Sequence, residues 1–183
     1  MKVSKTNLID CLLIEPRVFK DFRGSFFESF SKLRYQQDAL INHEFVQDNF
    51  SSSRKGVLRG LHFQRKNPQG KLVRVSRGKV YDVAVDIRPR SQTFKKWFGL
   101  ELSEENKFQL WIPPGFAHGF LVLSEEADFE YKCTSYYDPN DEACIRWDDP
   151  EIGIKWPVIE DIIVSEKDNN APYSKDLTFG HCS

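Results

Sequence analysis

The chain has 183 residues, which predicts one domain spanning residues 1–183 with a core large enough to fold without a disulfide or a metal. Its 26 basic and 27 acidic residues leave a formal net charge of −1, which excludes attraction of the whole molecule to nucleic acid or an acidic membrane. Aromatic residues make up 14% of the chain and include 15 Phe, a content that favours strands over a helical bundle.

The first predicted element in chain order is a short helix that begins after a Ser31 cap and ends at about Leu40. A strand with the sequence VLRGLHFQ is predicted next, at residues 57–64. Its apolar run is interrupted by a cation and an imidazole. The position of these two side chains is the main question that the sequence raises.

Arg59 and His62 are three residues apart, so strict alternation would place them on opposite faces of the strand. Gly60 lies between them, and a glycine within a strand is typical of a bulge that redirects a side chain, so both are expected to face one cavity. Gln64 shares the parity of His62, and Lys71 opens the next strand after a turn, which predicts four polar side chains on neighbouring strands of a hairpin. A surface arginine, a core histidine and a solvated lysine are the alternative interpretation.

Further strands are predicted from alternation and apolar runs at 80–87, 110–112, 120–123 and 129–136. In the first of these, Asp82 and Asp86 share the polar face of a half-buried strand. In the last, Tyr131 shares the inward face with two apolar residues, so its phenol is expected to be buried beside a hydrogen-bond partner. A capped turn is predicted at 103–106, and the polar tail from about residue 165 is predicted to be irregular. Many short strands and few helices predict an all-β jelly-roll sandwich or barrel with an interior pocket.

His118 follows the turn Pro113-Pro114-Gly115 and has small neighbours that leave room for a ligand, although a turn-capping histidine explains it equally well. A metal-binding jelly roll usually offers two histidines one residue apart and a nearby carboxylate. Here the residue two after His62 is Gln64, and no ligand stands beside His118. The sequence therefore predicts no metal site.

The cysteines form no CxxC pair and have no regular spacing: they are Cys11, Cys133, Cys144 and Cys182. The N-terminal segment lacks an apolar stretch of signal-peptide length, and no run approaches the roughly 20 apolar residues of a membrane span. We therefore expect a reduced cytoplasmic protein that contacts no membrane.

Six long motifs occur in order between about residue 8 and Pro172, and together they resemble the dTDP-4-dehydrorhamnose 3,5-epimerase family. They are DFRGSFFE (21–28), FVQDN (45–49), VLRGLHFQ (57–64), QGKLVR (69–74), IPPGFAHGF (112–120) and WDDPEIGIKWP (147–157). The resemblance implies a cupin-type jelly roll and an isomerase that needs no cofactor. Such an enzyme removes and returns protons at C3 and C5 beside the ketone of dTDP-4-keto-6-deoxy-D-glucose, and its product is dTDP-4-keto-L-rhamnose.

The resemblance also implies the role of each matching residue. His62 is the base, Asp168 holds it, Tyr131 is the acid across the sugar ring, and Lys71 stabilises the enolate. The remaining matching positions are expected to bind the dTDP-sugar: Arg23, Phe26, Glu28, Gln47, Asn49, Arg59, Lys71, His118, Glu142 and Lys167. In the family an N-terminal strand crosses to a partner subunit, so a homodimer is implied in which Arg23 and Phe26 serve the neighbouring site.

Three other functions compete with this reading. A relative that epimerises only C3 or only C5 of a nucleotide 4-keto sugar would keep the histidine and change the acid or the ring contacts, and the presence of Tyr131 favours the double epimerase. A silent sugar-nucleotide binding module is disfavoured by the complete set of His62, Asp168, Lys71 and Tyr131. A metal-dependent oxygenase is disfavoured by the missing ligands.

Overall fold

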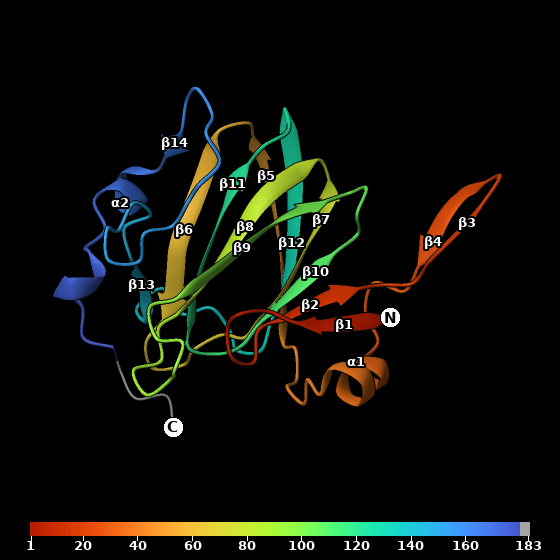
Figure 1. Ribbon diagram of the computed structural model, residues 1–183, viewed down its shortest axis with the longest axis horizontal. Coiled ribbons are helices and arrows are strands. Elements are labelled where there is room, and N and C mark those ends of the chain that lie inside the picture. The colour runs from red at the N-terminus through yellow and green to blue at the C-terminus, as the bar shows by residue number, and fades with distance from the viewer. Residues whose placement is uncertain (180–183) are drawn as a thin grey trace.

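The computed structural model describes residues 1–179 and is built mainly from two antiparallel β-sheets, which confirms the all-β, cupin-type prediction (Figure 1). The first sheet contains, in spatial order, β1 (Lys2–Lys5), β2 (Leu12–Glu15), β10 (Gln109–Ile112), β7 (Lys71–Arg77), β12 (Glu126–Cys133) and β5 (Gln47–Arg54). The second contains β13 (Glu142–Cys144), β6 (Val57–Gln64), β11 (Phe116–Val122), β8 (Lys79–Asp86) and β9 (Trp97–Ser103), with β14 (Ile163–Val164) parallel to β6.

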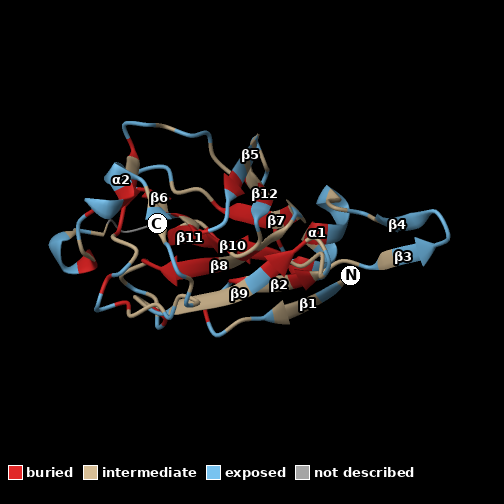
Figure 2. Cartoon of the chain, turned by 90° about the horizontal axis from the view of Figure 1, so that it is seen from above, coloured by how far each residue is buried: buried red, intermediate tan, exposed pale blue. Residues whose placement is uncertain are grey.

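The main core lies between the two sheets. Val73 and Phe129 point into it from the first sheet, and Val80 and Phe120 from the second. Figure 2 shows the buried residues concentrated on the central strands β8, β10 and β11. Because side chains alternate along each strand, the residues two positions from these apolar anchors also face the interior. That rule determines which polar groups line the space between the sheets.

Strand β8 differs from the half-buried strand that its alternation predicts, because both of its faces are covered. Val83 and Val85 pack in a second apolar cluster that includes Ile154 and Trp156 from the C-terminal part of the chain. The opposite face carries Asp82 and lies against the main core, where this residue has no exposed surface. The predicted solvent-facing aspartate is therefore an interior group.

The predicted bulge in β6 is confirmed. His62 pairs with His118 of β11 while Arg59 pairs with Phe120, so β6 has one residue more than β11 over this interval. Gly60 has φ +129°, and a Cβ placed on it would lie 2.6 Å from the Cα of Gly119. The bulge turns both Arg59 and His62 toward the space between the sheets.

The predicted β6–β7 hairpin is wrong. Strand β7 pairs with β10 and β12 in the first sheet, whereas β6 lies in the second. The chain crosses from one sheet to the other between Gln64 and Lys71. The Lys71 side chain therefore enters the interior from the first sheet, whereas His62 enters it from the second. Side-chain parity along a strand gives the face of a residue, but it does not identify the neighbouring strand.

The first helix is confirmed as α1 (Lys32–Ala39), which begins after Ser31 as predicted, but the Ser31 side chain makes no capping hydrogen bond with the described residues. The turn at 103–106 is confirmed by the Ser103 hydroxyl, which accepts the Asn106 N–H. The tail after residue 165 contains α2 (Glu166–Asn169) and the 3-10 turn η1 (Ser174–Asp176), so the prediction of an irregular tail is wrong there. Ser165 caps α2 by accepting the N–H of Asp168, a local signal that a polar composition conceals.

Strands β3 (Val18–Asp21) and β4 (Gly24–Phe27) form a separate hairpin that projects away from the two sheets (Figure 1). It is largely exposed (Figure 2), and the side chains of Phe22 and Phe26 keep 98% and 72% of their surface in solvent. Large apolar side chains seldom gather on an arm of a monomer, so this hairpin is a candidate contact surface. Within residues 1–179 no helix has the length and apolar character needed to cross a membrane.

Candidate active site

The centre of the candidate site is a histidine–carboxylate pair. His62 Nε2 lies 2.7 Å from Asp168 Oδ1, and the backbone N–H of Gly60 donates to Asp168 Oδ2 at 3.1 Å. Burial tends to raise the pKa of Asp168, but the hydrogen bond and the charge of His62 outweigh it, so the pKa is lowered. Helix α2 thus brings to the bulge a carboxylate from 106 residues further along the chain. With its Nε2–H donated to Asp168, His62 keeps Nδ1 as its basic nitrogen.

Cys144 also reaches this pair. Its thiol lies 3.7 Å from Asp168 Oδ1, and burial is the main reason that the pKa of the thiol is raised. One ligand atom each from His62, Cys144 and Asp168 lie within 4.8 Å of one another, a set that resembles a metal site and that the sequence spacing did not reveal. A metal there would have to displace the thiol proton and break the His62–Asp168 hydrogen bond. The three groups fit better as a hydrogen-bonded unit.

A second histidine–aspartate pair lies on the neighbouring strands. His118 Nε2 is 2.8 Å from Asp82 Oδ2, and both side chains are buried. Burial lowers the pKa of His118 despite the adjacent carboxylate. Sequence reasoning missed Asp82, although its place in an otherwise apolar alternation was a usable signal. Asp82 Oδ1 is buried and has no hydrogen-bond partner among the described residues.

Lys71 and Tyr131 face this interior from the first sheet. The Lys71 Nζ lies 5.8 Å from the centre of the Tyr131 ring. Burial lowers the pKa of Lys71, and it raises the pKa of Tyr131 to about 12. Arg59 donates to the Ser53 hydroxyl at 3.0 Å, and its charge acts against the rise in the tyrosine pKa. The phenol therefore stays protonated at neutral pH, with the Lys71 ammonium beside its ring and the charge of Arg59 acting on it.

The polar groups at the edge of the site come from β5 and β13. Gln47 donates to Asn49 at 2.9 Å, and the backbone N–H of Tyr137 donates to Gln47 at 2.8 Å. Glu142 accepts from the Tyr137 hydroxyl at 3.0 Å and pairs with Lys167. Tyr137 thus joins two groups that the sequence predicted separately. Gln64, in contrast, is buried and bonds backbone atoms of the adjoining loops, which gives it a structural role.

Three predicted binding residues lie away from the His62 site, on or beside the projecting hairpin. Arg23 lies on the projecting hairpin and pairs with Asp21, and the Phe26 side chain on the same hairpin points mainly into solvent. Glu28, at the base of the hairpin, pairs with Arg34 of α1 at 3.4 Å. No hydrogen bond or ion pair connects these three residues to the His62 site within the described part of this chain.

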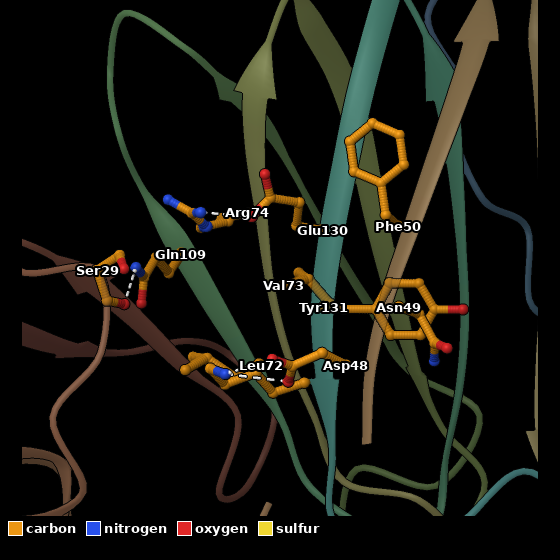
Figure 3. A pocket seen from close by; sticks show the side chains of 11 residues that line it. Ser29, Asp48, Asn49, Phe50, Leu72, Val73, Arg74, Gln109, Glu130 and Tyr131 are labelled. Atoms are coloured by element: carbon orange, nitrogen blue, oxygen red, sulfur yellow. Dashed lines mark hydrogen bonds and ion pairs between the residues drawn. The ribbon is translucent and has the colours of Figure 1, made fainter.

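A separate cavity of about 400 Å³ lies on the outer face of the first sheet (Figure 3). Arg74 and Glu130 form an ion pair beside it, and Phe50 keeps 63% of its surface exposed there. Figure 3 shows Tyr131 and Asn49 pointing away from Arg74 and Glu130, as alternation requires. Tyr131 and Asn49 are among the residues that line this cavity, whereas His62, Lys71 and Asp168 are not.

A family model described as dTDP-4-dehydrorhamnose 3,5-epimerase matches residues 5–176. The dTDP-4-dehydrorhamnose 3,5-epimerase of Salmonella typhimurium is 56% identical over 173 residues, which are 94% of each chain. A solved dTDP-6-deoxy-D-glucose-3,5-epimerase from Legionella pneumophila, in complex with dTDP-4-keto-L-rhamnose, superposes with a TM-score of 0.94 at 51% identity. That match covers 97% of this chain and 94% of the other.

A more distant solved structure is that of an enzyme that inverts a single centre. A 3'-monoepimerase from Streptomyces bikiniensis, in complex with dTDP-quinovose, superposes with a TM-score of 0.85 at 31% identity, covering 92% of this chain and 85% of the other. The same fold therefore occurs in enzymes that invert two centres and in an enzyme that inverts one.

Proposed function

Because the chain belongs to the dTDP-4-dehydrorhamnose 3,5-epimerase family, we propose that it converts dTDP-4-keto-6-deoxy-D-glucose into dTDP-4-keto-L-rhamnose by inverting C3 and C5. The observation that carries this proposal is the 2.7 Å contact between His62 Nε2 and Asp168, in an interior that also receives Lys71 and Tyr131. Each inversion requires a base, an acid on the opposite side of the ring, and positive charge at the ketone oxygen.

His62 removes the proton. Its Nδ1 takes hydrogen from C3 or C5, and the electron pair of the broken C–H bond forms the enolate with the C4 ketone. The imidazolium is stabilised by Asp168, whose lowered pKa keeps it ionised. The Gly60 N–H fixes the second carboxylate oxygen, so the ring of His62 keeps the orientation that presents Nδ1.

The enolate oxygen then needs charge stabilisation. Lys71 and Arg59 supply that charge, and the buried His118–Asp82 pair supplies a positioned imidazole. Tyr131 returns a proton from the other side of the ring. Burial that raises its pKa to about 12 suits this role, because the phenol stays protonated until a strong carbon base forms.

The nucleotide side of the substrate requires a second copy of the chain in this proposal. Gln47, Asn49, Glu142 and Lys167 lie at the edge of the site, while the hairpin carries an arginine and an aromatic ring outward. An arginine suits diphosphate oxygens, and a ring suits a base or sugar. We therefore assign Arg23 and Phe26 to the site of a partner subunit in a homodimer, with Glu28 placed at the root of the exchanged strand.

The decisive experiment follows solvent hydrogen into the sugar. The protein is incubated with dTDP-4-keto-6-deoxy-D-glucose in deuterated water that contains a chelator, and label at C3 and C5 is measured by mass spectrometry. Label at both carbons supports the double epimerase. Label at one supports a single-centre epimerase, such as the Streptomyces relative, and no label at either carbon contradicts the proposal.

Two variants test the assigned roles in the same assay. His62→Ala should abolish exchange at both carbons, because it removes the imidazole assigned as the base. Tyr131→Phe should allow exchange and impair inversion, since the base can still remove and return a proton on its own side. A Tyr131→Phe enzyme with normal exchange and normal inversion would exclude the phenol as the acid.

A further inference from the structure

We propose that Cys144 is a positioning residue whose thiol donates a hydrogen bond to Asp168 and thereby holds His62 in its reactive tautomer. The inference rests on the proposed function for its kinetic consequence, but its structural content does not depend on any activity. Cys144 lies on β13, directly opposite His62 of β6, so neighbouring strands present the thiol and the imidazole to the same carboxylate.

The thiol has one hydrogen and, among the described residues, two acceptors within reach. Its sulfur lies 3.4 Å from the carbonyl oxygen of Ile145 and 3.7 Å from Asp168 Oδ1. The carbonyl of Ile145 already accepts the N–H of Leu61 at 3.0 Å, whereas Asp168 carries a full negative charge. A charged acceptor forms the stronger hydrogen bond, which directs the S–H toward the carboxylate.

Three donors then fix Asp168. The His62 Nε2–H and the thiol share Oδ1, and the Gly60 N–H takes Oδ2. Asp168 is only 3% exposed, so no bulk water can replace a missing donor cheaply. Removing the thiol frees the carboxylate to rotate, which weakens its control of the His62 tautomer. It also leaves the negative charge of Asp168 less compensated, which favours the imidazolium form of His62.

Tautomer and pH dependence provide the test. In protein labelled with ¹⁵N, two-bond proton–nitrogen spectra of His62, assigned with His62→Gln, should show the hydrogen on Nε2. In Cys144→Ala the tautomers should mix, kcat should fall about fivefold to tenfold with KM unchanged, and the acidic limb of the kcat/KM profile should move to higher pH. Cys144→Ser, which keeps a donor, should restore all three properties.

The control is Cys11→Ala, which removes a fully buried thiol that packs in the main core and has the Thr6 hydroxyl as its hydrogen-bond neighbour. It should leave the His62 spectra and the pH profile unchanged. Wild-type spectra in Cys144→Ala, or a Cys144→Ser variant that behaves like Cys144→Ala, would overturn the proposal. Absence of epimerase activity in the wild type would contradict the proposed function instead, and the spectra would still decide the role of the thiol.

Discussion

At residue 62 the sequence supplies an imidazole, and the fold supplies its carboxylate partner from a short helix near the other end of the chain. Asp168→Asn tests this dependence. The amide can donate to Nε2, which would move the ring hydrogen to Nδ1 and leave no base toward the sugar, so kcat should fall about 10²- to 10⁴-fold. Steady-state kinetics measure the loss, and an Asn variant with normal kcat would contradict the assignment.

The same substitution has a signature in stability. The pKa of Asp168 is lowered in the folded chain, so its ionised form stabilises the fold at all pH values above the ordinary carboxyl pKa of 3.8, and this contribution is lost as the pH falls through the folded pKa. The difference in melting temperature between wild type and Asp168→Asn should therefore be largest near neutral pH and should narrow below 3.8. Scanning calorimetry at several pH values measures this.

Lys71 should show opposite effects on activity and stability. Burial lowers the pKa of its ammonium, because the loss of hydration outweighs the opposing charges of Asp82 and Glu142. Lys71→Met should abolish epimerisation and raise the melting temperature by about 2–5 °C, from about 1–2 kcal/mol of relieved desolvation. The gain in melting temperature should shrink as the pH rises toward the ordinary lysine pKa of 10.5, where the unfolded lysine also loses its proton.

Lys132→Met is the matched control, because Lys132 lies on β12 and pairs with Asp48 at the surface. It should change neither the activity nor the melting temperature appreciably. A destabilised Lys71→Met protein would show that the ammonium has an interior partner that outweighs its desolvation.

The residue types predicted many members of the candidate site, but not which of these side chains contact one another. The parity of β12 correctly placed Tyr131 inward, and Gly60 correctly indicated the bulge. Alternation predicts a solvent-facing Asp82, because it does not show whether a strand is covered on one face or on both. The contact of Cys144 with Asp168 depends on the pairing of β13 with β6, which no local pattern encodes.

At the level of elements, the bulge of β6 depends on two glycines in contact. Gly60→Ala should be strongly destabilising, by about 3 kcal/mol or more, because φ is +129° and the added Cβ would lie 2.6 Å from the Cα of Gly119. Gly24→Ala separates the two causes, since Gly24 has φ +132° but no atom within 4 Å of the new Cβ. Denaturant unfolding of both variants measures the difference, which should exceed about 1 kcal/mol in favour of Gly24→Ala.

Element positions were more predictable than element neighbours. Alternation and turn residues gave β8 and β10 to within one residue at each end, whereas β11 begins four residues before its predicted start and β12 is shifted by three residues toward the N-terminus. The pairing of β7 with β10 and β12, in place of β6, follows from the jelly-roll crossing, which is a property of the whole chain. The sequence did not predict the short helix α2, because a single capped turn has little hydrophobic periodicity.

For the whole molecule, the position of the β3–β4 hairpin bears on whether a second chain completes the site. The exposed aromatic residues of this projecting hairpin support completion by a partner. To serve its own subunit, the β3–β4 hairpin, which we call the arm, would have to fold back over the sheets. In the structure the arm makes no contact with the His62 site among the described residues.

Mixing two defective variants decides between these arrangements. A His62→Ala chain keeps its arm, and an Arg23→Ala/Phe26→Ala chain keeps its base. If arms serve the neighbour, each hybrid dimer contains one intact site, and equal mixing by refolding should restore roughly a quarter of the wild-type sites, since half of the dimers are hybrids. A mixture of His62→Ala with Asp168→Asn should restore none, because both changes lie in the body of a subunit. Mixed arm and base variants that stay inactive, in a sample shown to be dimeric by sedimentation, would mean that each chain completes its own site.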